Sequence, residues 1–195
     1  MLFLDALLLL LAVQASPDLD DQVLAQRIKR GDERAFRLFF ERHQQTLWHY
    51  LIRRGVPSDP AADLVQQAFV TIWNRRDTID DGKSLRSLLF TIGHNRGTNY
   101  FRDTKKFTSD EVLVTAASET RTEGEAMHNE MLDTLHAAVA RLPERRRAVF
   151  ELCFMQQLTY REAAEVLDVS IKTIENQMGH ALKAVRSAMQ TFREA

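Results

Sequence analysis

The sequence predicts an all-α protein with two small helical domains joined by a flexible linker. Its 195 residues are enough for two small domains, and they include only 7 Gly and 4 Pro. Apolar residues recur every three or four positions along most of the chain, which is the period of a helix with one buried face. No pattern of a strand hairpin occurs in the sequence.

The uneven distribution of charge marks the domain boundaries. Residues 18–107 carry 16 Lys and Arg against 12 Asp and Glu, and residues 108–127 carry one Arg against five acidic residues. In residues 128–195 basic and acidic residues balance. The pattern indicates a weakly basic domain, an acidic linker and a second domain.

Residues 1–17 form an apolar N-terminal extension. Its apolar run has no preceding Lys or Arg, contains Asp5 and is shorter than the roughly 18 residues of a membrane-spanning helix. The favoured interpretation of this extension is an extra helix, or an upstream start, without function. A helix that contacts a partner or a membrane is less favoured, and an export signal is the least favoured. With one cysteine, the chain is expected in the reducing cytoplasm.

The first domain is expected to contain four helices, which span about Leu19–Arg30, Glu33–Arg54, Asp59–Trp73 and Leu85–Lys105. Gly31 suits the left-handed stop of the first helix, and Asp32 is placed to cap the second. The polar segment Asn74–Ser84 is expected to be a loop. The residues expected to face inward are Val23, Leu24 and Ile28; Phe36, Phe39, Phe40, Leu47, Trp48, Leu51 and Ile52; Leu64, Val65, Phe69, Ile72 and Trp73; and Leu88, Leu89 and Ile92.

The second domain begins with helices expected over about His128–Arg141 and Glu144–Gln157, separated by the break at Leu142-Pro143. Cys153 lies among apolar residues and is expected to be a buried, inert thiol. The six histidines include no pair at the spacing of a helical metal site, so we expect no metal, and no cofactor is indicated.

The segment Thr159–Arg186 predicts a helix-turn-helix that reads duplex DNA; the alternative is an ordinary helical hairpin. Thr159 and Glu162 form a capping box at its start, and Ser170 begins its second helix. Val166, Leu167 and Val169 are expected to join the two helices. In the second helix the inward residues are Ile171, Ile174, Met178, Ala181, Leu182 and Val185, and the outward ones are Lys172, Glu175, Asn176, Gly179, His180 and Lys183.

Two blocks of motifs together resemble an extracytoplasmic-function sigma factor, a member of the sigma-70 family of bacterial RNA polymerase specificity subunits. The first block contains GDERAF, DLVQQAFVTIW and LLFTIGHNRGTNYFR, and the second contains LPERRRAVFEL, LTYREAAEVLDVSIKTIENQ and ALKAVR. The resemblance implies that residues 18–107 are sigma region two and residues 128–195 region four, with 108–127 as the linker.

The resemblance also implies a polymerase-binding surface on the third helix. The matching residues are Asp63, Leu64, Gln66, Gln67, Phe69 and Trp73. For Leu64, Phe69 and Trp73, a place in the core is an equally good interpretation.

For the minus-ten promoter element, the family traps a flipped base with a loop that matches Asn74–Ser84 and binds the single strand with the helix that follows. Basic and aromatic side chains suit phosphate contact and base stacking. The candidates are Asn74, Arg96, Asn99, Tyr100, Arg102 and Lys105. The alternative is a solvated basic end of a helix.

For the minus-thirty-five element, Lys172 and Thr173 are candidates for phosphate contact at the helix N-terminus, with Lys183 further along. Glu175, Asn176, Gly179 and His180 are candidates for base contact. Glu175, Gln177 and His180 stand where relatives often have basic residues, so the isolated domain is expected to bind DNA weakly and to depend on tethering to the polymerase.

The leading hypothesis is therefore a non-enzymatic subunit that binds core RNA polymerase and promoter DNA, reads both promoter elements and helps melt the duplex. No phosphate loop, nucleophile constellation or carboxylate pair indicates an enzyme or a small-molecule substrate. The family implies an anti-sigma partner, often a membrane protein. The alternatives are a LuxR-like regulator that binds its operator without polymerase, and an interaction switch in which the N-terminal extension marks a membrane-linked complex.

Overall fold

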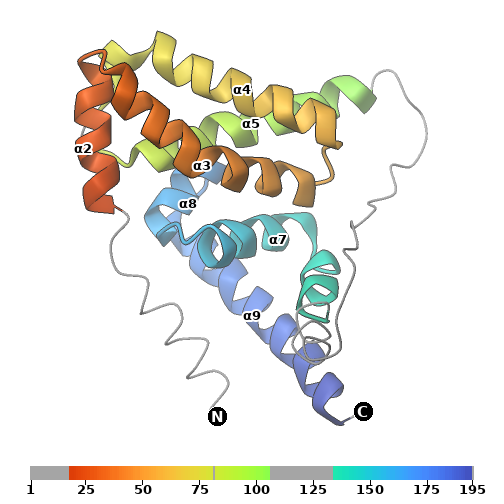
Figure 1. Cartoon of the computed structure of the whole chain (residues 1–195). Helices are drawn as coiled ribbons and strands as arrows, with labels where there is room; N and C mark the ends of the chain where they lie inside the picture. The colour runs from red at the N-terminus through yellow and green to blue at the C-terminus, as the bar shows by residue number, and fades with distance from the viewer. Residues whose placement is uncertain (1–17, 81, 106–133, 195) are drawn as a thin grey trace, which may run out of the picture. The chain divides into compact units, whose positions relative to one another are not determined.

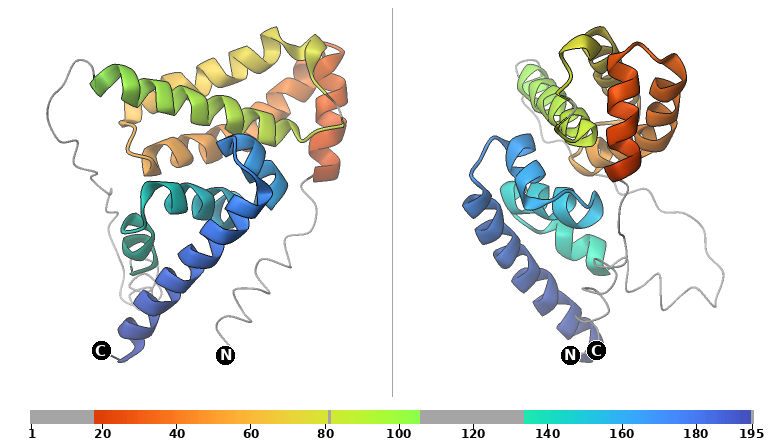
Figure 2. Two further views of the ribbon diagram at one scale, coloured as in Figure 1. Left: turned by 180° about the vertical axis from the view of Figure 1, so that it is seen from behind. Right: turned by 90° about the vertical axis from the view of Figure 1, so that its left-hand side faces the viewer.

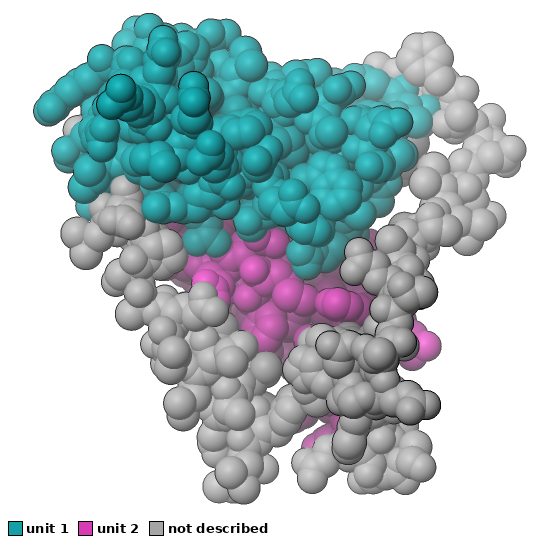
Figure 3. All heavy atoms as spheres, in the orientation of Figure 1, with its two compact units in different colours: residues 1–111, 165–168 teal, residues 112–164, 169–195 magenta. Residues whose placement is uncertain are grey.

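The computed structural model describes residues 18–80, 82–105 and 134–194, and every regular element in these ranges is a helix. The chain divides into two compact units, residues 1–111 with 165–168 and residues 112–164 with 169–195 (Figure 3). The predicted all-α fold is confirmed. The extension 1–17, the linker 108–127 and the predicted boundaries beside them lie outside the described residues and stay predictions.

The first unit contains the helices α2 (Asp18–Lys29), α3 (Glu33–Arg53), α4 (Ser58–Asn74) and α5 (Leu85–Lys105). Helix α3 contacts the other three, and α4 packs along α5 (Figures 1 and 2). The largest buried side chains of this unit are Ile28, Phe39, Leu47, Tyr50, Leu51, Phe69, Ile72, Leu85, Leu89 and Phe90. They come from all four helices, so the four enclose one core.

Local signals determine the helix ends as predicted. Gly31 has a φ of 83°, in the left-handed region that ends α2. The Asp32 carboxylate accepts hydrogen bonds from the backbone amides of Arg34 (2.9 Å) and Ala35 (3.1 Å), which caps α3. The prediction of one loop over 74–84 is partly wrong, because Asn74 still belongs to α4 and a short 3₁₀ helix, η1 (Arg76–Thr78), follows.

Two residues expected to face inward are exposed. Val23 is 53% exposed, because the buried residues of α2 are Asp21, Leu24, Ala25 and Ile28, and at 100° per residue Val23 lies on the other side of the helix. Leu88 is 37% exposed. The sequence pattern misplaced both, and Val23 was grouped with its sequence neighbour Leu24, which lies on the buried side.

Helices α3 and α5 approach closely where α5 has glycine. A Cβ built on Gly93 lies 2.6 Å from Cδ1 of Leu47, and one built on Gly97 lies 3.0 Å from Cδ2 of Leu51. Real side-chain atoms do not approach within the first of these distances without a shift. The absence of a side chain at Gly93 therefore allows Leu47 to lie directly against the backbone of α5.

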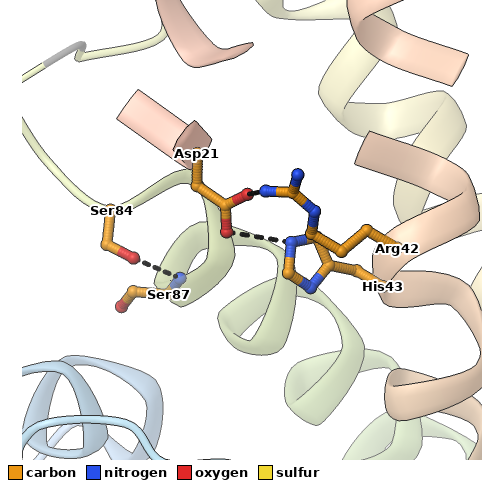
Figure 4. A network of polar contacts seen from close by, with 5 residues as sticks. All are labelled: Asp21, Arg42, His43, Ser84 and Ser87. Carbon is orange, nitrogen blue, oxygen red and sulfur yellow. Dashed lines mark hydrogen bonds and ion pairs between the residues drawn. The ribbon is translucent and has the colours of Figure 1, made fainter. Parts of the chain in front are cut away.

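A polar cluster around the buried carboxylate of Asp21 links α2 to α3 (Figure 4). One oxygen of the Asp21 carboxylate accepts from Nη1 of Arg42 (2.6 Å) and the other accepts from Nε2 of His43 (2.9 Å). Burial alone would raise the pKa of Asp21, but the hydrogen bonds and charge interactions with His43 and Arg42 outweigh it and hold that pKa below its ordinary value of 3.8. The ionised carboxylate therefore stabilises the packing of α2 on α3.

The second unit contains a helix over residues 134–140, then α7 (Glu144–Phe150), α8 (Tyr160–Leu167) up to Ala164, and α9 (Ile171–Glu194). The predicted helix over Glu144–Gln157 is only partly regular, since a π-helical turn, η3 (Glu151–Met155), follows α7. Cys153 in this turn is buried, and burial raises its thiol pKa to about 12, so the thiol is inert as predicted.

Across the described ranges of both units, no helix combines the length and the apolar character needed to span a membrane.

Candidate polymerase and nucleic-acid interfaces

Side chains cap the N-terminal ends of both α8 and α9. The backbone amide of Thr159 donates to the Glu162 carboxylate (2.7 Å), and the amide of Glu162 donates to the Thr159 hydroxyl (3.2 Å). The predicted capping box is thus confirmed. Ser170 caps α9 by accepting from the Thr173 amide (3.1 Å), and Asp168 between the helices has a φ of 52°. Each helix of the pair therefore begins at a side-chain cap.

Replacing Thr159 with alanine is expected to lower the free energy of unfolding of the second unit by about 1 kcal/mol, because the capping box is lost. Urea unfolding of the full chain measures this loss. Thr159→Ser keeps the hydroxyl and is the control, expected to cost much less. Equal losses in both variants would show that the methyl group, and not the cap, stabilises this end.

The outward side of α9 is polar and exposed. The exposed members are Lys172, Glu175, Asn176, Gly179, His180 and Lys183, as predicted. Nothing lies within 4 Å of a Cβ built on Gly179, so this position is open to a partner. Thr173 is half-buried, and its hydroxyl lies 2.9 Å from that of Ser170. This hydroxyl is therefore engaged in the helix cap.

One interaction on this face was missed from the sequence. The ammonium of Lys172 lies 3.0 Å from the Glu175 carboxylate. The three-residue separation of opposite charges on a helix was the signal that could have revealed it. A phosphate that binds Lys172 must compete with Glu175, which agrees with the weak isolated DNA binding expected from the sequence.

Two apolar residues of the turn are not in the core. Val169 is 40% exposed and Ile171 is 44% exposed, so their predicted inward positions are wrong. The buried residues here are Ala163, Ala164 and Val166 of α8 with Ile174, Met178, Ala181 and Val185 of α9. Apolar residues beside a turn need not follow the period of the helix they join.

Helix α4 presents a polar row on its outer side. Asp63, Gln66 and Gln67 are exposed as predicted, whereas Leu64 and Trp73 are half-buried. Val70, 55% exposed, joins this row and was missed. Its position three residues after Gln67 and four after Gln66 was the available signal. We define the α4 face as Asp63, Gln66, Gln67 and Val70.

Phe69 does not belong to that face. It is 2% exposed, and its ring packs against Phe36, Phe39 and Phe40 with centroid distances of 6.2, 5.7 and 4.8 Å. The ring offers almost no surface to a partner, which favours a place in the core over direct docking. The core interpretation left open by the sequence holds for this residue.

Trp73 lies at the edge of the core. Its ring packs on Phe36 at 4.9 Å, and the guanidinium of Arg76 lies 4.6 Å from its centroid. Arg76 also donates to the Trp73 carbonyl (2.9 Å). These contacts hold the half-buried indole in place at the end of α4.

The last turns of α5 carry the predicted polar and aromatic side chains. Asn99 and Arg102 are exposed, and Tyr100 is half-buried with its ring 5.7 Å from that of Phe101. Arg102 lies 3.4 Å from Asp103. The side chain of Lys105 lies outside the described residues. This arrangement places cationic and stacking groups on one helix end, as single-strand binding requires.

Two of the minus-ten candidates lie elsewhere. Asn74 ends α4, and because α4 and α5 run in opposite directions it lies at the end of the pair away from Arg102 (Figure 1). Arg96 is turned toward α4, where Nη1 donates to Oε1 of Gln67 (2.6 Å) and Nη2 to the hydroxyl of Thr71 (2.8 Å). The structure therefore separates Arg96 from the exposed basic end.

Two protein families match the chain. Residues 39–107 match the family described as Sigma-70 region 2, and residues 132–185 match that described as Sigma-70, region 4. The first match covers most of α3 and all of α4 and α5, and the second covers the helix-turn-helix up to Val185. The presence of both regions disfavours an operator-binding regulator that resembles LuxR proteins only in its C-terminal domain.

Whole-length relatives agree with these matches. The chain is 26% identical to the ECF RNA polymerase sigma-E factor of Escherichia coli strain K12, over 90% of this chain and 97% of that protein. It is 25% identical to the RNA polymerase sigma-H factor of Pseudomonas aeruginosa, with the same coverage of both proteins.

Solved structures are similar over most of the chain. CnrH, solved in complex with the cytosolic domain of CnrY, is 26% identical with a TM-score of 0.64, and the match covers 88% of this chain and 98% of that one. The sigma factor RpoE of Bartonella quintana, solved with the anti-sigma factor NepR, is 20% identical with a TM-score of 0.62, and the match covers 80% and 96% of the two chains. The second likeness concerns the fold alone.

Proposed function

Because the chain belongs to the extracytoplasmic-function group of the sigma-70 family and is an alternative sigma factor, we propose that its two units divide promoter recognition between them. The first unit binds core RNA polymerase through the α4 face and the melted minus-ten strand through α5. The second unit reads the minus-thirty-five element with the outward side of α9. Catalysis belongs to the polymerase, and the site of action is the cytoplasm, where polymerase and chromosome meet.

The observation that carries this proposal is that each unit leaves a polar helix side exposed opposite its buried side. On α9 this side starts at the capped turn, as in a helix that enters the major groove. On α4 it consists of Asp63, Gln66, Gln67 and the apolar Val70. Docking surfaces combine apolar contact with a polar rim, and the α4 face supplies a small surface of this kind.

The path of the minus-ten strand follows from the direction of α5. The 21-residue helix α5 is about 30 Å long at 1.5 Å per residue. It begins at Leu85, after the segment that follows the last residue of α4, Asn74. A base flipped near Asn74 and a backbone contact at Arg102 therefore define opposite ends of one track. The strand binds along this track, with Tyr100 available for stacking near its far end.

A partner of the anti-sigma class completes the proposal. CnrH, which is similar over most of this chain, was solved in complex with the cytosolic domain of a second protein. A partner that covers the α4 face of this chain would prevent polymerase binding without any change of fold.

Transcription in vitro with core polymerase and promoters selected from random DNA tests the function. We expect the full chain to stimulate initiation at a subset of promoters that share two elements separated by a constant spacing. Absence of stimulation together with absence of core binding would exclude it. Binding of a palindromic duplex as a dimer without polymerase would support the operator-binding alternative.

The division between the two units is tested by paired variants of the full chain. Gln66→Ala combined with Val70→Ser is expected to weaken core binding about tenfold, which corresponds to about 1.4 kcal/mol, with promoter preference unchanged. Glu175→Ala combined with Asn176→Ala is expected to alter minus-thirty-five preference at unchanged core affinity. Fluorescence competition measures core affinity, and promoter selection measures preference.

The matched control for the α4 pair is Val23→Ser, since Val23 on α2 is as exposed as Val70, at 53% against 55%. It is expected to leave core affinity unchanged. Equal losses of core affinity in the α4 pair and the α9 pair would refute the division.

A further inference from the structure

Arg96 joins the strand-binding helix to the polymerase-facing helix. Its Nη1 donates to Oε1 of Gln67 at 2.6 Å and its Nη2 donates to Oγ1 of Thr71 at 2.8 Å. Gln67 and Thr71 are four residues apart, so they lie one turn from each other on the same side of α4. The planar guanidinium therefore spans one full turn of the neighbouring helix.

The contact is fixed from both sides. The hydroxyl of Thr71 donates to the carbonyl of Gln67 (2.7 Å), so it meets Arg96 with a lone pair and not with its hydrogen. Nε of Arg96 is enclosed and has no hydrogen-bond partner within the described part of the chain. The guanidinium is thus held against the protein by its two terminal nitrogens, and its inner nitrogen is shielded from water.

Arginine determines which end of the Gln67 amide points outward. A guanidinium carries only donors, so the amide atom 2.6 Å from it must be the carbonyl oxygen. With its oxygen occupied, the amide offers its NH₂ group to a partner. An unrestrained glutamine would offer either end and would lose side-chain entropy when a partner bound it.

Binding of a phosphate by Arg96 would break hydrogen bonds within the protein, whereas binding by Arg102 would not require this. Arg96 would have to release two charge-assisted hydrogen bonds, which are among the stronger kinds in proteins. The side chain of Arg102 is 64% exposed, and its carboxylate neighbour lies at the long distance of 3.4 Å. Between Arg96 and Arg102, it is therefore Arg102 whose guanidinium is exposed for DNA binding.

We propose that Arg96 is a positioning residue for polymerase docking, which orients the Gln67 amide so that its NH₂ meets an acceptor oxygen on the polymerase, and that it is not a ligand of the DNA backbone. This inference rests on the proposed function. It replaces the role that the sequence predicted for Arg96. On the α4 face, it makes the Gln67 NH₂ group a hydrogen-bond donor to the polymerase.

The first test measures the affinity of the full chain for core polymerase. Arg96→Ala and Gln67→Ala are each expected to weaken binding about fivefold to tenfold, and the double variant is expected to bind about as well as the weaker single variant, because the two residues act as one unit. Gln67→Glu keeps an acceptor for Arg96 but removes the NH₂ group, so it is expected to weaken binding as well. Arg37→Ala, an exposed arginine on α3, is the control with unchanged affinity.

The second test measures the salt dependence of DNA binding by the assembled holoenzyme at saturating core polymerase. On a fork promoter with a single-stranded minus-ten element, Arg102→Ala is expected to reduce the slope of log K against log salt by about 0.7 to 0.9, the value for one phosphate contact. Arg96→Ala is expected to leave the slope unchanged. A merely structural role of Arg96 would lower the melting temperature without non-additivity in core binding, so thermal unfolding accompanies both tests.

The outcomes separate the possibilities. An unchanged core affinity with a reduced salt slope in Arg96→Ala would overturn the proposal in favour of a phosphate contact, and additive losses in the double variant would overturn it as well. If Arg96→Ala is too unstable to assay, Arg96→Lys keeps the charge without the planar fork and is expected to weaken core binding similarly. Failure of the unmodified chain to bind core polymerase would instead refute the proposed function.

Discussion

Replacing Phe69 with alanine is expected to lower the free energy of unfolding of the first unit by about 4 kcal/mol. The ring is 2% exposed and contacts three phenylalanines of α3, so its removal leaves a cavity that rigid neighbours cannot fill. Urea unfolding of the full chain, followed by circular dichroism, measures the loss.

Two further variants, Phe69→Leu and Val70→Ala, are the controls for this result. The leucine variant retains most of the apolar volume and is expected to bind core polymerase normally after a loss of about 1 kcal/mol. Val70→Ala changes an exposed neighbour and is expected to cost less than about 0.5 kcal/mol, as is usual for a surface substitution. A stable Phe69→Leu variant that fails to bind core polymerase would show that the ring contacts the polymerase after all.

Asp21→Ala is expected to destabilise the first unit by about 3 kcal/mol at neutral pH. The variant leaves His43 and the guanidinium of Arg42 without the carboxylate that both contact at 2.6–2.9 Å. Asp21→Asn keeps one acceptor and is expected to cost less. Because α2 packs on α3 through this cluster, hydrogen exchange in α2 is expected to increase more than in α4.

The same carboxylate predicts a dependence of stability on pH. The pKa of Asp21 is lowered in the folded chain, so its contribution is fully present above its unfolded value of 3.8 and is lost as the pH falls through the lower, folded value. The difference in unfolding free energy between the unmodified chain and Asp21→Asn is therefore expected to shrink below about pH 4. A difference that stays constant to pH 2 would contradict the ionised cluster.

Local chemistry explains why most helix ends could be predicted. Gly31, Asp32 and the pair Thr159 and Glu162 act within a few residues of themselves, and each performs its predicted role in the structure. Errors arose where an apolar residue lies next to a buried residue in the sequence or beside a turn. Val23 lies on the side of α2 opposite the buried residues, and Ile171 lies in the first turn of α9, and both are exposed.

The candidate interfaces could be predicted only as far as they depend on one helix. The exposure of Asn176 on α9 and of Gln66 on α4 follows from helical spacing within each segment. The contact of Arg96 with Gln67 joins residues 29 positions apart and depends on how α5 packs on α4, which spacing does not encode. For Phe69, the period allowed a buried ring or an edge residue, and only the packing of three other rings distinguishes them.

The close approach of α3 and α5 constrains how this chain can change over evolution. Gly93 and Gly97 are four residues apart on α5, and Leu47 and Leu51 have the same spacing on α3. Additional volume at position 93 requires the Leu47 side chain to shift or to become smaller, since the two already share one space. Helices α5 and α3 are therefore expected to diversify as a pair at these positions, while the exposed residues of α5 can change independently of α3.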